Sequence, residues 1–422
     1  LYPYHGLGLS GRYSLEIWDS SMGEILFIAH RIPYPPNKGD KIRSFNILKH
    51  LSRSHQVHLG AFVDDSSDMR YKKKLEAFCE STCLLPLSPK RARLRSLSGL
   101  VRNTALSIPY FFDPRMRDWI HEQLASRDLQ GVFVYSSQMA QYFMGCMLPR
   151  ARYIIDFCDV DSDKWSQYAR HKQWPLSWLY QREASLLLRF ERDASLMFDA
   201  SIFVSAQEAS LFRRLAPDVS DRVSIINNGV DHQYFVPSDH YEDPFKGCKH
   251  VAVFTGAMDY WANVDAVIWF AREVFPILRD SIQTAQFAIV GARPSAEVLS
   301  LASISGVSVI GAVKDIRPYL AYAGVAVAPM RIARGVQNKV LEAMSMARPV
   351  VATCGALEGI ETKGSCGLAI ADSAADFAAR TLEFLESAGN NYYDDSRRWV
   401  CDRYDWDKIL GKLDDYLGFT QH

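Results

Sequence analysis

The sequence predicts an α/β protein with two doubly wound, Rossmann-like domains. Short apolar segments of strand length alternate with longer segments of helical pattern, and the alternation restarts after residue 236. Alternating strands and helices favour parallel sheets that are covered on both faces. The length of 422 residues suits two domains of about 100–200 residues each. We expect ligands to bind at the carboxyl ends of the strands, where the two domains would face each other across a cleft.

Composition excludes several other classes of protein. Apolar residues make up 48% and charged residues 23% of the chain, which is ordinary globular composition. Lys and Arg total 48, as do Asp and Glu, so no overall charge favours nucleic acid. The eight cysteines are too sparse for a disulfide scaffold. No apolar run approaches the ~18 residues of a membrane span, and no signal-peptide pattern is present, so we expect a cytoplasmic protein.

The first domain is expected over residues 22–236. Residues 1–21 precede Met22 and show no sustained period, so we expect a tag or an upstream extension there. Apolar runs bounded by Gly, Pro and Asp predict buried strands, and the segments between them predict helices. The expected strands are 25–30, 57–63, 132–135, 153–156 and 201–205, and the expected helices are 41–52, a charged helix containing 72–74, and 175–198.

The second domain is expected over residues 237–400. It begins with a polar stretch that contains two prolines, 237–249, which is typical of a linker. A largely helical segment ends the chain, and we expect its last part, a C-terminal helix over 401–422, to return to the first domain. The expected strands are 251–255, 287–290, 307–310, 325–328 and 349–352, and the expected helices are 263–278, 316–323 and 338–346.

A glycine stands in the loop after the first strand of each domain. Gly39 lies in the loop before the helix 41–52, and Gly256 directly follows the strand 251–255. A glycine lets the backbone approach a ligand closely, and the next helix offers free N–H groups to an anion. The same arrangement in both domains favours a phosphate-bearing ligand. The alternative is ordinary turn chemistry, with Asp40 as the N-cap of the first helix.

Residues 331–349, RIARGVQNKVLEAMSMARP, carry the most specific pattern. A helix is expected to begin near residue 338, so that Lys339 and Glu342 lie three residues apart on one face. At the carboxyl edge of a buried strand, Lys339 with backbone N–H groups would hold a phosphate, and Glu342 would accept hydrogen bonds from a pair of hydroxyls. The alternative is an exposed ion pair worth only ~0.2–0.5 kcal/mol.

This segment resembles the nucleotide-sugar motif of family-4 glycosyltransferases, which are retaining enzymes of the two-domain GT-B fold. The resemblance extends over almost the whole chain from Met22. It includes the turn NGVD at 228–231 and the segments PYLAYAGVAVAPM and LEAM…RPVVAT. IPYPPNKGDKIR, DFCDVDSDKW and ARGVQNKVLEAM are similar to a bacterial subgroup that is found with PEP-CTERM (exosortase) exopolysaccharide loci.

The resemblance implies transfer of a hexosyl-type sugar from a nucleotide-sugar to a saccharide or polyprenyl-linked acceptor, without a metal or other cofactor. Glu342 matches the second Glu of the family's E-x7-E motif, which usually binds the donor ribose, whereas the first Glu is replaced by Arg334. The family's diphosphate-binding Arg and Lys fall at Ala257 and Ala262. We expect Lys339 and Arg334, with Arg331 or Arg293, to replace that charge; the alternative is a degenerate site.

Residues 156–163, DFCDVDSD, place four carboxylates after a strand of the first domain. The family often has a polar catalytic residue, commonly His, near this position. Asp159 or Asp161 would serve as an acceptor-side base or as electrostatic support for a cation-like sugar. The alternative is that these carboxylates cap the next helix, which contains Trp165. Between a strand and a loop, this segment is the only candidate for a metal-binding DxD motif, and we expect no metal there.

The expected site therefore has three parts. The catalytic residues are Asp159, Asp161, Lys339 and Arg334. The donor-binding residues are Gly39, Gly256, Val313 in the base-reading loop 311–314, Gly335, Val336, Gln337, Asn338, Lys339 and Glu342. The acceptor-side residues are His30, Asp40, Lys41, Tyr135 and Ser136.

Residues 90–102, KRARLRSLSGLVR, interleave Arg with Leu. They form an amphipathic pattern that suits an anionic membrane surface and so a lipid-linked acceptor, at the inner face of the cytoplasmic membrane. The alternative is a solvated helix face. Two other functions remain open: a nucleotide-sugar-binding protein with a degenerate catalytic site, and a GT-B-fold nucleotide-sugar epimerase.

Overall fold

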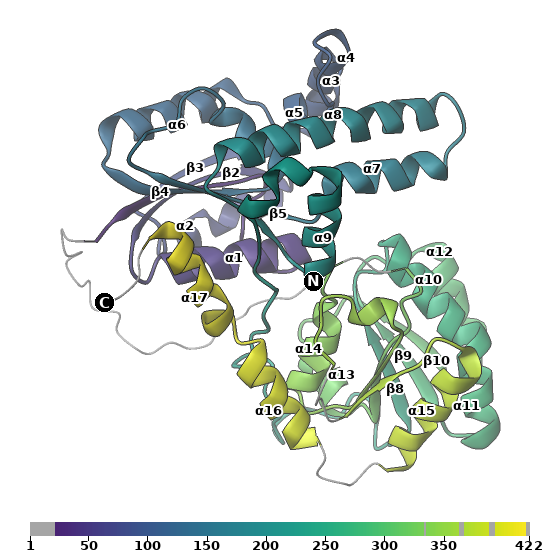
Figure 1. Cartoon of the computed structure of the whole chain (residues 1–422). Helices are drawn as coiled ribbons and strands as arrows, with labels where there is room; N and C mark the ends of the chain where they lie inside the picture. Colours follow the sequence, from purple (N-terminus) through teal and green to yellow (C-terminus); the bar gives the residue numbers. More distant parts are fainter. Residues whose placement is uncertain (1–21, 333–334, 363–366, 388–392, 419–422) are drawn as a thin grey trace. The chain divides into compact units, whose positions relative to one another are not determined.

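The structure is a computed structural model that describes residues 22–332, 335–362, 367–387 and 393–418. It divides into two units (Figure 1). The N-terminal unit holds residues up to Ile226 together with the chain end from Leu410, and the C-terminal unit holds Asn227–Ile409. The division precedes the expected boundary at residue 236, and the last helix, α17 (Trp406–Leu417), begins later than the expected residue 401. The doubly wound α/β fold predicted from the sequence is confirmed.

The N-terminal unit is built on a seven-stranded parallel sheet in the order β3-β2-β1-β4-β5-β6-β7. β3 and β7 were not expected, because β3 is only partly buried at the sheet edge and β7 is too short to show a period. The strands are β1 (Glu24–Ala29), β2 (Gln56–Val63), β3 (Ser81–Pro86), β4 (Leu129–Tyr135), β5 (Arg152–Cys158), β6 (Ala200–Phe203) and β7 (Val223–Ile225).

Helices connect these strands and cover the sheet (Figure 1). The helices are α1 (Gly39–Leu51), α2 (Lys72–Leu75), α3 (Pro89–Ser96), α4 (Ser98–Val101), α5 (Ser107–Tyr110), α6 (Pro114–Ser126), α7 (Asp161–Arg170), α8 (Leu176–Met197) and α9 (Ala206–Leu215), with 3₁₀ turns at Ser66–Tyr71, Ser137–Tyr142 and Pro217–Arg222. The end of α17 also packs here, since His50 Nε2 lies 3.0 Å from Asp414 Oδ1.

The C-terminal unit is built on a six-stranded parallel sheet in the order β10-β9-β8-β11-β12-β13. The strands are β8 (Val251–Thr255), β9 (Gln286–Val290), β10 (Val307–Gly311), β11 (Val325–Ala328), β12 (Val350–Ala352) and β13 (Leu368–Ile370). The helices are α10 (Trp261–Trp269), α11 (Phe275–Ser281), α12 (Ala296–Ser300), α13 (Arg317–Ala321), α14 (Asn338–Ser345), α15 (Ala374–Glu386) and α16 (Tyr393–Arg403), with 3₁₀ turns at Leu301–Ser303 and Gly355–Leu357.

One expected helix is divided. Residues 263–278 form α10, a π-helical turn at Phe270–Val274 and then α11. Pro276 has no N–H to continue the α-helical ladder, and it stands in the first turn of α11, where such an N–H would lack a partner in any case.

A buried ion pair joins α1 to β5 inside the N-terminal unit. Arg43 Nε donates to Asp156 Oδ2 at 2.8 Å, and the two side chains are 2% and 0% exposed. Asp156 Oδ1 also accepts from the Cys158 N–H at 2.9 Å, and the Asp156 carbonyl accepts from the Ser136 N–H at 2.8 Å. These bonds fix the ends of β4 and β5 against α1.

We expect Arg43→Met to lower the free energy of unfolding by about 3–5 kcal/mol, because it leaves the Asp156 carboxylate buried without its counter-charge. Urea denaturation at pH 7 measures the change. The matched control is Arg192→Met, which breaks the exposed Arg192–Asp218 pair and should change stability little. Equal effects of the two substitutions would contradict the structural role of the buried pair.

Candidate functional site

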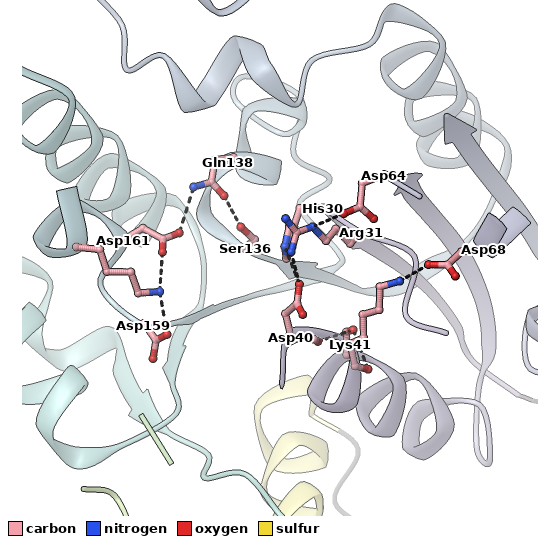
Figure 2. Close-up of polar contacts among 12 residues, drawn as sticks. His30, Arg31, Asp40, Lys41, Asp64, Asp68, Ser136, Gln138, Asp159 and Asp161 are labelled. Atoms are coloured by element: carbon pink, nitrogen blue, oxygen red, sulfur yellow. Dashed lines mark hydrogen bonds and ion pairs between the residues drawn. The ribbon is translucent and has the colours of Figure 1, made fainter. Parts of the chain in front are cut away.

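Polar side chains gather at the carboxyl ends of β1, β4 and β5, the three central strands of the N-terminal sheet (Figure 2). Because these strands are parallel neighbours, the loops that follow them meet at one edge of the sheet. The first turn of α1 contributes a further carboxylate. The residues of this cluster are His30, Arg31, Asp40, Ser136, Gln138, Asp159, Asp161 and Lys164.

One half of the cluster is centred on Asp40. Arg31 Nη1 donates to Asp40 Oδ2 at 2.8 Å, and Arg31 Nε lies 3.1 Å from Asp64 Oδ2. His30 Nε2 lies 3.6 Å from the same oxygen of Asp40. Burial alone would raise the pKa of Asp40, but His30 and Arg31 outweigh it and hold that pKa well below its usual range. Asp40 is therefore an ionised acceptor in the first turn of α1, whose N-cap is Lys38, so the alternative of Asp40 as N-cap is wrong.

Aromatic rings hold His30 in place. Its ring stacks on Tyr135 and meets Phe111 edge-on, with centroids 5.7 Å away in both cases. Tyr135 and Ser136 are buried: the Tyr135 ring stacks on His30, and Ser136 Oγ donates to Gln138. The ammonium of Lys41 is buried as well and lies 2.5 Å from Asp68 Oδ2. The acceptor-side role of these three residues stays a prediction.

The other half of the cluster is centred on Lys164. Its ammonium lies 2.9 Å from Asp159 Oδ2 and 3.0 Å from Asp161 Oδ1, while Gln138 Nε2 donates to Asp161 Oδ2 at 3.2 Å. Burial would lower the pKa of Lys164, but the two carboxylates raise it well above its usual value. Burial alone would raise the pKa of Asp161, but the contacts with Lys164 and Gln138 outweigh burial and lower that pKa. Asp159 and Asp161 are thus brought together as expected, with a lysine that the sequence argument missed.

The N-terminus of α7 does not depend on these aspartates. Glu208 accepts from the Val160 N–H at 2.7 Å, and Glu191 accepts from the N–H and hydroxyl of Ser162 at 3.2 and 2.5 Å. Burial raises the pKa of Glu191 to about 8. Since α7 shows no side-chain cap from Asp159 or Asp161, the alternative that they serve as N-caps is wrong.

In the C-terminal unit, Lys339 reaches from α14 to the end of β8. Lys339 Nζ donates to Asn263 Oδ1 at 2.7 Å, and Asn263 Nδ2 donates to the Ala257 carbonyl at 2.9 Å. A Cβ at Gly256 would stand 2.8 Å from Asn263 Nδ2 and 3.4 Å from Lys339 Nζ, so only glycine leaves this space open. The structure therefore brings Gly256 and Lys339 together, and Asn263 is a second residue that the sequence argument missed.

Lys339 is a desolvated cation. It lies 4.0 Å from the centre of the Phe254 ring. Burial lowers its pKa to about 7, and Glu342, one turn along α14, partly opposes that shift. Glu342 is buried on the same helix, and its charge also contributes to the raised pKa of Tyr234. A lysine with so low a pKa at the carboxyl edge of a parallel sheet is a candidate for binding chemistry.

Four further expected donor residues lie at or just before the start of α14. Gly335 has a φ of +64°, and Val336 is buried. Gln337 is the N-cap of α14 without a side-chain cap, and Asn338 Oδ1 accepts from Asn228 at 3.4 Å. Val313 follows β10, and Gly39 begins α1 of the N-terminal unit, so their contacts with a donor stay predictions.

The other cations that were expected at the donor site are Arg334, Arg331 and Arg293. Arg334 lies outside the described residues. Arg331 pairs with Asp265, and Arg293 Nε lies 2.7 Å from Asp259 Oδ2; both arginines are about half exposed. Within the ranges that the structure describes, no group of three His, Cys, Asp or Glu side chains is arranged to hold a metal ion. The same ranges contain no helix long and apolar enough to cross a membrane.

Comparison with known proteins agrees with the fold of the chain. Residues 249–387 match the family model described as "Glycosyl transferases group 1". Anabaena HepE in complex with UDP covers 94% of the chain with a TM-score of 0.66 at 16% identity, over 100% of its own length. The chain has the GT-B glycosyltransferase fold.

Other structures share this GT-B fold. Sucrose-phosphate synthase from Thermosynechococcus elongatus covers 94% of the chain and 99% of its own, with a TM-score of 0.68 at 16% identity. WaaG, a glycosyltransferase involved in lipopolysaccharide biosynthesis, covers 93% and 99%, with a TM-score of 0.61 at 16% identity. A search of curated proteins finds no match.

We expect Lys164→Met to lower the free energy of unfolding at pH 7 by about 1.5–3 kcal/mol, because Asp159 and Asp161 lose a charged hydrogen-bond donor. Asp161 has a depressed pKa in the folded protein, so this contribution is present at neutral pH and is lost as the pH falls below about 4. Urea denaturation at pH 7 and at pH 2.5 measures both effects. Lys172→Met, at an exposed lysine between α7 and α8, is the control. A loss no larger than that of the control would contradict the role of Lys164.

Proposed function

We propose that the protein is a retaining glycosyltransferase that moves a hexosyl-type sugar from a nucleotide-sugar to a saccharide or polyprenyl-linked acceptor in exopolysaccharide biosynthesis. The observation that carries the donor site is the Lys339–Asn263 contact beside Gly256, within the segment that matches the group 1 glycosyltransferase model. Support for the nucleotide comes from HepE, which has been solved with UDP and with UDP-glucose. A lipid-linked acceptor would place the enzyme at the inner face of the cytoplasmic membrane.

Lys339 would stabilise the negative charge that develops on the leaving diphosphate. Ala257 and Ala262 carry no charge, and Lys339 reaches the backbone of this same loop through Asn263. A partly dehydrated ammonium interacts more strongly with phosphate than an exposed one does. Glu342, buried on the following turn, would accept hydrogen bonds from the ribose hydroxyls. We expect this transfer reaction to need no metal, because Lys339 and backbone N–H groups would supply positive charge to the leaving diphosphate.

The cluster of the N-terminal unit would serve the acceptor side. The carboxylates of Asp159 and Asp161 would support an oxocarbenium-like sugar, in a mechanism where the leaving phosphate and the acceptor hydroxyl share one face. His30 and Asp40 would bind the acceptor. The alternative is a nucleotide-sugar-binding protein with a degenerate site, which Ala257 and Ala262 favour. It predicts donor binding without product, and an epimerase predicts a changed sugar without an acceptor.

Thermal unfolding with UDP, GDP, ADP or CMP at saturation tests the donor site. One nucleotide at about 100 times its Kd should stabilise the protein by about 2.7 kcal/mol. Glu342→Gln keeps the side-chain volume and should remove most of the shift, because the amide cannot accept both ribose hydroxyls as a carboxylate does. Glu297→Gln on α12 is the control. If Glu342→Gln shows the same shift in unfolding temperature as the wild type, the nucleotide binds elsewhere. If no nucleotide shifts the unfolding temperature of the wild type, the proposed donor site is contradicted.

The pH dependence of nucleotide binding tests Lys339 separately. Its pKa of about 7 must rise when a phosphate binds beside it, so binding takes up a proton above pH 7. We expect the affinity for the stabilising nucleotide to fall by up to tenfold between pH 7.5 and pH 8.5, measured by titration calorimetry. Lys339→Arg stays charged throughout this range and should bind with little pH dependence. The same pH profile in both proteins would exclude Lys339 as the titrating group.

A further inference from the structure

An unusually apolar surface lies on the helices that stand away from the N-terminal sheet. Val101 at the end of α4 is 90% exposed, and Trp174 in the turn before α8 is 80% exposed. Such side chains normally lie inside a protein, and contiguous exposed apolar patches mark interaction sites. We call this the α4–α8 surface; its apolar members are Leu94, Leu97, Leu100, Val101, Trp174, Leu176 and Trp178.

Hydrogen bonds join the two parts of the α4–α8 surface. Arg182 of α8 donates to the Gly99 carbonyl at 2.9 Å and to the Thr104 carbonyl at 3.2 Å. Trp178 precedes Arg182 by four residues and therefore lies on the same face of α8. Glu183 accepts from the N–H groups of Leu106 and Ser107 and so fixes α5 to α8 as well. Figure 1 shows α3, α4 and α5 beside α8, at the edge of the unit. These bonds place the segment 99–107 beside α8, so apolar side chains from two segments distant in the chain are exposed on neighbouring elements.

The segments that form the α4–α8 surface carry only positive charges. Residues 87–112 and 164–182 contain no Asp or Glu, although the chain as a whole has 48 of each charge sign. The exposed cations of these segments are Lys90, Arg91, Arg93, Arg102, Arg170 and Lys172. Arginine and lysine beside tryptophan and leucine form the composition that binds the interface of an anionic bilayer.

We propose that the α4–α8 surface docks the protein on an anionic phospholipid bilayer, with Trp174, Trp178 and Val101 in the headgroup region. A second copy of the chain fits poorly, because a two-fold interface would bring these cations against one another. A protein partner fits less well too, since charged residues are depleted from the cores of protein interfaces. Docking deepens the proposed function, because it assigns the membrane contact to this surface, and it does not depend on the nucleotide site.

Sedimentation with vesicles tests the proposal without any measurement of activity. Vesicles of phosphatidylcholine with 30% phosphatidylglycerol should bind the full chain in 0.1 M NaCl, and pure phosphatidylcholine vesicles should bind it far less. The variant Arg91→Gln/Arg93→Gln should bind the anionic vesicles about 25-fold more weakly, from about fivefold for each cation. Val101→Ser/Trp178→Ser should also weaken binding by at least tenfold. All four side chains are exposed, so the fold should be kept.

Leu299→Ser is the matched control, because Leu299 is 52% exposed on α12 of the other unit. Its binding should equal that of the wild type. The proposal fails if the wild type binds neither vesicle, if both vesicles bind it equally, or if the Leu299→Ser control loses as much binding as the surface variants. It also fails if the surface variants change the sedimenting mass of the protein alone, since the patch would then be a self-association interface.

Discussion

The Arg43–Asp156 ion pair is the interaction on which the N-terminal site depends. Two buried charges are costly to remove from water, so the pair persists only where geometry compensates each of them closely. Here Asp156 also accepts from the backbone of Cys158, and its carbonyl accepts from Ser136. One carboxylate therefore sets where β4 and β5 end relative to α1. The loops that begin at these points carry Asp159, Asp161 and Gln138, and α1 carries Asp40.

The charged groups of the two units differ in how fully neighbouring charges compensate them. In the N-terminal unit, each carboxylate of the cluster has a neighbouring cation, and the pKa values of Asp40 and Asp161 are held low. These two carboxylates are therefore ionised at neutral pH and accept hydrogen bonds from Arg31 and Gln138. In the C-terminal unit, Lys339 has an amide oxygen and an aromatic face as neighbours, and burial lowers its pKa. A cation that is incompletely compensated in the free protein gains most from an anionic ligand, which suits a donor diphosphate.

The helices outside the sheets add a third element. Arg95 donates to the carbonyls of Pro109 and Tyr110, and Arg182 donates to the Gly99 carbonyl of α4. These two arginines therefore stabilise the packing of the helices. The exposed cations of these segments and the exposed Trp174 and Trp178 belong to the α4–α8 surface. A membrane-bound acceptor and a membrane-docked enzyme would share the same two-dimensional surface, which raises the rate of encounter without any change in the active site.

The sequence by itself determined the α/β class, most of the strands and the pattern of the two sheets, because buried parallel strands are continuous apolar runs whose ends are marked by Gly, Pro and Asp. It also singled out Asp159, Asp161, Lys339 and Glu342 as candidate site residues, through local patterns and the family resemblance, and their roles stay predictions. Lys164 lies three residues after Asp161, so helical spacing offered a signal for it. No local pattern pointed to Asn263 or Arg31, since their partners are distant in the chain. Only the tertiary structure decided that Lys41 and Tyr135 are buried, because burial depends on what packs against a side chain from other segments.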